Sequence, residues 1–158
     1  MESKGIYVQP HPIWEFYIGI NSFDDYKQYL PTTVLIETVN DEIKGYYQPI
    51  HKLLEFGYFE YSFITIAFRN SINMLELILK EFYLRSEKAP KAKMTLNSLI
   101  TWLVSEKLID NNQQETLSKL KDIRNDYSHP SKNSVVTIGV ISIIDLILKI
   151  ANTFATGL

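Results

Sequence analysis

Three side chains that can act together on a phosphate stand within six residues of one another. The stretch 120–130 reads LKDIRNDYSHP and contains Arg124, Asn125 and His129. On a helix, Asn125 and His129 share one stripe because they are four residues apart, and Arg124 lies about 100° round the axis from Asn125. A guanidinium grips a phosphate with its planar fork, and an imidazole exchanges protons near neutral pH. These residues therefore indicate acid–base chemistry at a phosphate.

The same side chains also have a purely structural interpretation. Basic residues are common in the last turn of a helix, where they complement the dipole and bind the last carbonyl groups. Pro130 is expected to end the helix, because the residue before a proline is pushed out of the helical conformation. From the residues alone this structural interpretation is the more common one. The stretch closes one core helix and is followed by a turn and a long apolar helix.

The spacing of apolar residues predicts the helices that must position this stretch. One begins at Tyr58, is about 28 residues long and is apolar on so much of its circumference that it must be central in the fold. Thr95 is expected to cap the next helix. The last two cover about 113–128 and 134–154.

The first part of the chain is less regular and rich in aromatic residues. Ser22 and the two aspartates after it predict a short helix. A threonine at position 32 or 33 is expected to cap a further helix, whose apolar residues run over 34–43. Gly45 and Pro49 then predict a break or a kink.

Strand signals are weak throughout the 158 residues, so the predicted class is all-α. We expect an up-and-down helical bundle with a four-helix core and an N-terminal extension. Residues 1–56 would form the helical extension and 57–158 the helical core of one compact domain. The most apolar stretch, 135–144, is shorter than the roughly 18 residues that a bilayer span needs. It predicts a buried helix and no membrane contact.

The composition excludes several kinds of function. No cysteine is present, so disulfides, thiolate metal sites and cysteine nucleophiles are ruled out. His11 and His51 have no partner at metal-ligand spacing, so we expect no metal, and we expect no cofactor. The formal net charge is -2, so only a local patch could hold RNA. The candidates for such a patch are Lys88, Lys91, Lys93, Lys121 and Lys132. No secretory signal is visible, which favours the cytoplasm.

Two of these features have ordinary alternatives. The lysines within 88–93 belong to a loop, and such a run is more often simply solvated. Tyr46, Tyr47 and the aromatic residues before Leu30 could stack on bases, but packing in the core or an interface is the favoured interpretation. Asp145, inside the apolar last helix, is either exposed at one face or paired with a basic residue.

The string Arg-Asn-x-x-x-His at 124–129, in this setting, resembles the signature of the HEPN superfamily (higher eukaryotes and prokaryotes nucleotide-binding). The resemblance covers about 58–154, which would form the four-helix core of that family. It implies a metal-independent endoribonuclease of the kind used as a toxin or in antiviral defence. It also implies that an acidic or polar residue of the long helix faces the site, and Glu76 is the matching position.

The resemblance implies a reaction in which the 2′-hydroxyl of RNA attacks the adjacent phosphodiester. The catalytic residues would be Arg124, Asn125 and His129, supported by Glu76, Asp126 and Ser128. One histidine serves both ends of an in-line displacement poorly, so a homodimer that joins two motifs is implied. Its expected interface is the 124–129 region with the helix 134–154, which carries more apolar side chains than one bundle face requires.

An inhibitory antitoxin or another regulatory partner is also expected from the resemblance. Ser131 stands where relatives paired with nucleotidyltransferase antitoxins tend to carry a tyrosine, so regulation through that tyrosine is not predicted. The alternative function is a catalytically silent helical module that binds a partner protein or a nucleotide, with Arg124 and His129 serving only to cap a helix.

Overall fold

The computed structural model describes residues 9–17, 19–86, 93–127 and 138–156. These ranges contain six α-helices and one short 3-10 helix. In chain order they are η1 (Pro12–Phe16), α1 (Phe23–Lys27), α2 (Asp41–Phe56), α3 (Ser62–Leu84), α4 (Leu96–Ser105), α5 (Asn111–Tyr127) and α6 (Gly139–Ala155). No strand occurs in these ranges. The predicted all-α class is therefore confirmed.

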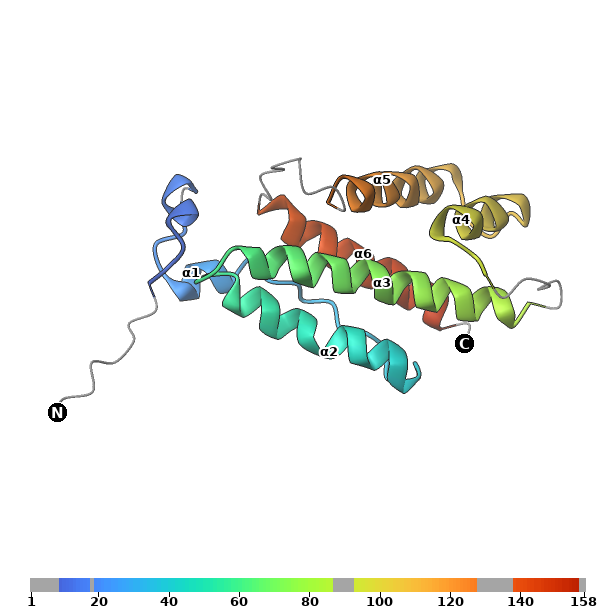
Figure 1. Cartoon of the computed structure of the whole chain (residues 1–158), viewed down its shortest axis with the longest axis horizontal. Helices are drawn as coiled ribbons and strands as arrows, with labels where there is room; N and C mark the ends of the chain where they lie inside the picture. Colours follow the sequence, from blue (N-terminus) through green and yellow to red (C-terminus); the bar gives the residue numbers. More distant parts are fainter. Residues whose placement is uncertain (1–8, 18, 87–92, 128–137, 157–158) are drawn as a thin grey trace.

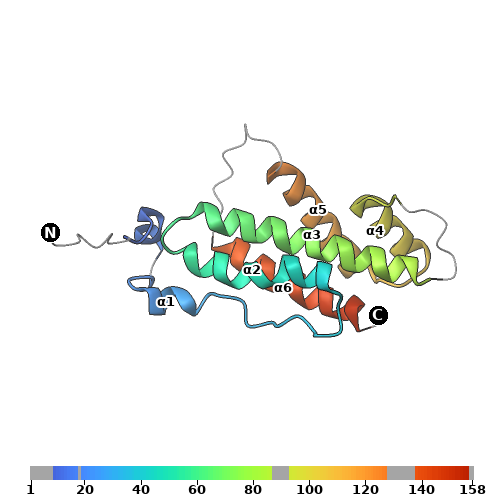
Figure 2. The same ribbon diagram turned by 60° about the horizontal axis from the view of Figure 1, so that its bottom comes forward.

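Helix α3 lies at the centre of the bundle, as its apolar circumference predicts. Ten of its side chains are buried, and those of Ile72, Leu75 and Leu79 have no exposed surface. Helices α2 and α6 pack along it, and the hairpin of α4 and α5 lies on another side (Figures 1 and 2). The helix begins at Ser62 rather than at Tyr58, because the intervening residues form the turn that follows α2.

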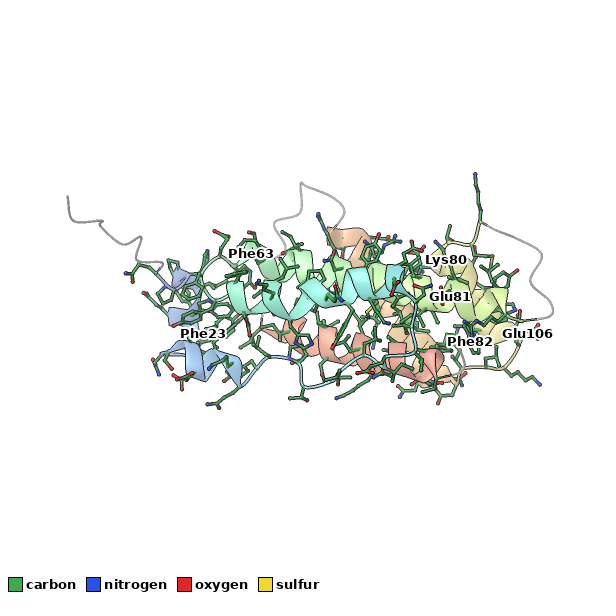
Figure 3. All side chains as sticks on the ribbon, turned by 90° about the horizontal axis from the view of Figure 1, so that it is seen from below. Phe23, Phe63, Lys80, Glu81, Phe82 and Glu106 are labelled. Carbon is green, nitrogen blue, oxygen red and sulfur yellow. The ribbon has the colours of Figure 1, made fainter. Side chains whose placement is uncertain are left out.

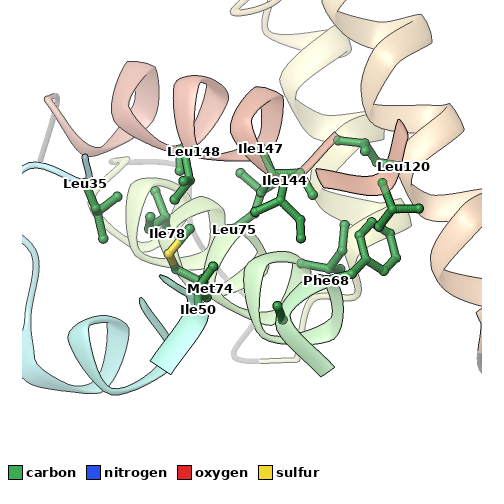
Figure 4. Close-up of a cluster of buried hydrophobic side chains, with 14 of the residues drawn as sticks. Leu35, Ile50, Phe68, Met74, Leu75, Ile78, Leu120, Ile144, Ile147 and Leu148 are labelled. Carbon is green, nitrogen blue, oxygen red and sulfur yellow. The ribbon is translucent and has the colours of Figure 1, made fainter. Parts of the chain in front are cut away.

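One hydrophobic core runs through the bundle and joins the segments on either side of residue 57. Leu35 and Ile50 are buried in the same cluster as Met74 of α3 and Leu148 of α6 (Figure 4). Because burial of such a side chain contributes about 1.5–3 kcal/mol, α2 and the segment before it stabilise the core as the later helices do. Within the described ranges, no helix combines the length and the apolar character that crossing a membrane requires.

The α4–α5 hairpin is positioned by local caps and by two buried leucines. The side chain of Thr95 caps α4, as predicted. Helix α5 begins two residues earlier than the predicted position 113, because Asp110 and Gln113 form a reciprocal capping box. Each side chain accepts a hydrogen bond from the backbone N–H of the other, at 2.8 and 3.0 Å. Leu117 and Leu120 are the buried residues of α5.

The helix predicted over 34–43 is wrong in its first part. Residues 31–36 are extended, and α2 begins only at Asp41. The cap is Asn40, whose Oδ1 accepts a hydrogen bond from the Ile43 N–H at 2.9 Å. A second bond joins the Asn40 amide to Glu81 of α3, which is labelled in Figure 3.

Two side chains of α6 hold the extended segment 31–36, which we call the strap. Asp145 Oδ1 accepts a hydrogen bond from the Thr33 N–H at 3.1 Å. Asn152 accepts one from the Ile36 N–H at 3.0 Å and donates one to the Val34 carbonyl at 2.8 Å. The backbone groups that a helix or sheet would satisfy are therefore satisfied here by side chains.

Asp145 is also paired with a basic residue, which was one of its two predicted environments. Lys149 Nζ lies 2.7 Å from its Oδ2. Burial alone would raise the pKa of Asp145, but the hydrogen bonds from Lys149 and Thr33 outweigh it and lower the pKa to about 2. The carboxylate is therefore charged at any ordinary pH.

Helix α2 is continuous across Gly45 and Pro49, so of the predicted break or kink the break does not occur. Pro49 removes the N–H that would have bonded to the Gly45 carbonyl. The turns on both sides are nevertheless fixed against the core, because Ile43 and Ile50 have no exposed surface. Tertiary packing here outweighs the local preference of proline.

The N-terminal aromatic residues pack with one another and with the α2–α3 turn. Trp14 Nε1 donates a hydrogen bond to the Tyr58 carbonyl at 2.8 Å, and the Tyr26 hydroxyl donates one to the Leu54 carbonyl at 2.6 Å. The rings of Trp14 and Tyr26 are 4.9 Å apart. Phe23, labelled in Figure 3, lies 5.4 Å from the Tyr58 ring. The packing interpretation is confirmed for these residues.

We expect Gly57→Ala to destabilise the protein by about 1–3 kcal/mol, because the added methyl group would overpack the turn. A Cβ at this position would lie 2.5 Å from Cγ1 of Ile64 and 3.0 Å from the Tyr26 hydroxyl. Gly45→Ala is the matched control, since its Cβ would meet nothing within 4 Å. In urea unfolding the control should be neutral or up to about 1 kcal/mol more stable. Equal effects of the two changes would contradict the close-packing argument.

We expect Asp145→Asn to lower the free energy of unfolding by about 1–2 kcal/mol at pH 7, because a charged acceptor is replaced by a neutral one. The pKa of Asp145 is lower in the folded chain than in the unfolded one, so its charge stabilises the fold above about pH 4. That contribution is lost as the pH falls through about 2. Chemical unfolding at pH 7, 4 and 2 should therefore show that the difference in free energy of unfolding between the wild type and Asp145→Asn becomes smaller as the pH falls. Asp24→Asn, at an exposed aspartate, is the control and should change little at any pH.

Candidate functional site

Arg124 lies in the last turn of α5 and contacts α3. Its Nη2 is 3.2 Å from Oε2 of Glu76. The carboxylate is largely buried, with 14% of the Glu76 side chain exposed, whereas 38% of the Arg124 side chain is exposed. The packing of α5 on α3 therefore brings together the arginine of the 124–129 motif and the acidic residue that was expected to face it.

The second carboxylate oxygen of Glu76 holds another cation. Its Oε1 is 3.1 Å from Nζ of Lys80, which lies one turn further along α3. These three side chains, two cations and one carboxylate, together carry one positive charge. The charges are partly shielded from water, so salt screens them less than it screens fully exposed pairs. The cluster therefore favours an anion beside it.

A pocket of about 230 Å³ opens next to this cluster. It is lined by Tyr46, Asn73, Glu76, Leu77, Lys80 and Arg124. Asn73, Leu77 and Lys80 are spaced four and three residues apart, so they lie along one stripe of α3. Tyr46 lines the pocket from α2, and Arg124 lines it from α5. We call this space the candidate pocket.

Other predicted site residues on α5 and near α4 do not line the candidate pocket. Asn125 and Asp126 follow Arg124 on α5 and are exposed. Lys121 Nζ donates a hydrogen bond to Oδ1 of Asn97 on α4 at 3.2 Å, so it joins the two helices of the hairpin. Lys93 is exposed just before α4. The structure thus brings Arg124 and Glu76 together and leaves the described lysines of the predicted patch elsewhere.

Five predicted site residues lie outside the described residues. They are Lys88, Lys91, Ser128, His129 and Lys132. Helix α5 ends at Tyr127, two residues before the histidine of the motif. In Figure 1 this end of α5 points back along α3 towards the start of that helix.

Helix α6 uses its apolar residues inside the chain. Ile141, Ile144 and Leu148 have no exposed surface, and Ile147 on another face is equally buried. Leu146 is the one large apolar side chain of the described helix that is exposed. Many apolar residues of the described helix are therefore used by the bundle, whereas Ile143 and Ile150 are half-buried. The homodimer through the 124–129 region and the helix 134–154 stays a prediction.

The candidate pocket contains residues to which the sequence assigned no role in the site. Lys80 could have been found, because it stands four residues after Glu76, the spacing of a helical ion pair. Asn73 lies on the same helix one turn before Leu77, but nothing in the sequence distinguishes it from other polar residues on that helix. Tyr46 comes from α2, outside the 58–154 resemblance. The sequence offered it only as one of several aromatic residues that could stack on bases, and the packing of α2 on α3 places it at this pocket.

Comparisons with family models, with curated proteins and with solved structures found no match to this chain. The similarity of the 124–129 stretch to the HEPN superfamily therefore remains a prediction from the sequence.

We expect Glu76→Gln to lower the free energy of unfolding by about 1 kcal/mol, because two ion pairs around a largely buried carboxylate are lost. The loss should shrink in 1 M salt, where the Debye length is about 3 Å. Glu115→Gln is the matched control, since it breaks an exposed pair with Lys119 one turn away. Urea unfolding should show a change under about 0.5 kcal/mol for the control. Equal effects of the two variants would contradict a special role for Glu76.

Proposed function

We propose that the protein is a metal-independent RNA endonuclease of the HEPN type, acting as a toxin or as an effector of antiviral defence. The observation that carries the proposal is the place of Arg124. It stands at the end of α5, is held by Glu76 and borders a pocket with a local excess of positive charge. Such a guanidinium suits the charge that develops on a phosphate in the transition state.

The proposed reaction is an internal displacement at phosphorus. The 2′-oxygen of a ribose attacks the adjacent phosphorus and loses its proton to a general base. The bond from phosphorus to the 5′-oxygen of the next nucleotide breaks, and a general acid gives that oxygen a proton. The products are a 2′,3′-cyclic phosphate and a 5′-hydroxyl. No water is consumed in this step.

The motif residues have distinct proposed roles. His129 is the general acid or base, Arg124 binds the scissile phosphate, and Asn125 orients the histidine or the phosphate. The exposure of Asn125 fits this proposal, because a side chain that meets a substrate must be accessible. Two copies of the chain, paired through the 124–129 region and the helix 134–154, would supply two histidines for the two ends of the displacement. A regulatory partner would restrain such an enzyme in its host.

One observation favours the second candidate function, a catalytically silent module. The ion pair with Glu76 and the position in the last turn of α5 explain Arg124 without any reaction. In this case the motif stabilises the end of a helix, and the candidate pocket binds a nucleotide or nothing. Cleavage of RNA separates the two functions.

We expect the wild-type chain to cut RNA in excess EDTA, and His129→Ala to lose at least a hundredfold in rate, as removal of a general acid or base does. Arg124→Ala should lose a comparable factor, and Lys119→Ala, on the exposed face of α5, should cut as the wild type does. Gel analysis of fragment ends should show cyclic phosphates. Cleavage retained by His129→Ala would contradict the proposed mechanism. Absence of cleavage by the wild-type chain on all RNAs offered would favour the silent module.

A further inference from the structure

The candidate pocket has a composition that catalysis at the phosphate does not require. Arg124 and Glu76 belong to the charged cluster, but Tyr46, Asn73 and Leu77 are an aromatic, an amide and an aliphatic side chain. Tyr46 comes from α2, and Asn73 and Leu77 lie on the same stripe of α3 as Lys80. Their chemistry points to a ligand that carries an uncharged ring as well as an anion.

The lining includes a suitable side chain for each part of a nucleotide. Tyr46 of α2 is aromatic, Asn73 and Leu77 of α3 are an amide and an aliphatic residue, and Arg124 and Lys80 are cations. A base stacks on an aromatic ring, an amide pairs with the polar edge of a base, and cations bind the phosphate. The volume of about 230 Å³ is below the roughly 300–1,000 Å³ of sites for drug-sized ligands. It therefore suits one base.

We propose that the candidate pocket binds one unpaired nucleotide of the RNA substrate, with its base between Tyr46 and Asn73 and its phosphate at Arg124. This inference rests on the proposed function and adds a binding site for one unpaired base beside the phosphate that Arg124 binds. A base within a duplex is stacked and paired, so its edge and its face cannot enter a pocket of this kind. Asn73 and Tyr46 are thereby specificity-determining residues.

The charges of the pocket fit this assignment. Glu76 would repel a phosphate if it stood alone, but Lys80 and Arg124 each contact one of its oxygens. With both cations present, the phosphate meets a net positive side, and the carboxylate can accept a hydrogen bond from a base amine or a ribose hydroxyl. A phosphate that approaches Arg124 competes with Glu76 for part of the guanidinium, which has five N–H donors to share.

The test measures binding separately from cleavage. Full-length His129→Ala serves as the background, and fluorescence anisotropy gives its Kd for labelled single-stranded octamers of A, C and U and for a duplex of mixed sequence. We expect tighter binding of single strands than of the duplex. Adding Tyr46→Ala should weaken single-strand binding about tenfold, as loss of one stacked base does. Tyr46→Phe, which keeps the ring, should stay within about twofold of the background.

Three further variants keep the result interpretable. Tyr29→Ala removes a tyrosine that is 43% exposed and that lines a different hollow beside α6, so it should not change the Kd. Asn73→Leu should reduce the differences in Kd among the three octamers. Leu77→Trp should fill the pocket and weaken the binding of the octamers. Circular dichroism would reveal whether Tyr46→Ala folds, and if it does not, Leu77→Trp still tests the pocket.

The outcomes separate this inference from the proposed function. If the wild-type chain cuts RNA and neither Tyr46→Ala nor Leu77→Trp changes affinity, the pocket assignment is overturned and the enzyme stands. If octamers bind in a manner that depends on Tyr46 but no RNA is cut, the pocket assignment is supported and the enzyme is overturned. If no RNA binds to the background protein, the pocket assignment is overturned whatever the cleavage assay shows.

Discussion

The burial of α3 on most of its circumference is the constraint on which the rest of the structure depends. A helix of this kind must be covered by other elements, and α2, α6 and the α4–α5 hairpin provide the cover. Between α2 and α5 one stripe of α3 is left open, and there the helix presents Asn73, Glu76 and Lys80. The candidate pocket is thus the place where the covering of α3 ends. Its polar residues stand on the most rigidly packed element of the fold.

The ion pair between Arg124 and Glu76 connects packing to chemistry. It joins α5 to α3. The guanidinium of Arg124 that makes this contact is also the group that would bind the phosphate in the proposed function. This explains why the enzyme and the silent module both remain consistent with the geometry. A guanidinium that is already oriented loses less conformational freedom when an anion binds, and this preorganisation is valuable for catalysis and for plain binding alike.

The sequence predicted those elements whose signals are local. The caps at Ser22 and Thr95 and the central place of α3 depend on neighbouring residues and on helical spacing, and all three agree with the structure. The strap was predicted as helix because its apolar residues also fit that spacing, while the side chains that hold it extended are Asp145 and Asn152, more than a hundred residues away. Tyr46 was raised from the sequence as a residue that could stack on bases, but its place beside Asn73 and Arg124 depends on the packing of separate helices.

The strap also sets an order in which the chain can complete its fold. Helices α2 and α3 are neighbours in sequence and can pair as soon as both exist, because the loop between them is short. The strap cannot dock until Asp145 and Asn152 of α6 are available, although it precedes both helices in the chain. During synthesis, residues 31–36 would therefore stay undocked until α6 had been made. In that interval the apolar Leu35, which becomes almost fully buried, would be exposed to water or to a chaperone.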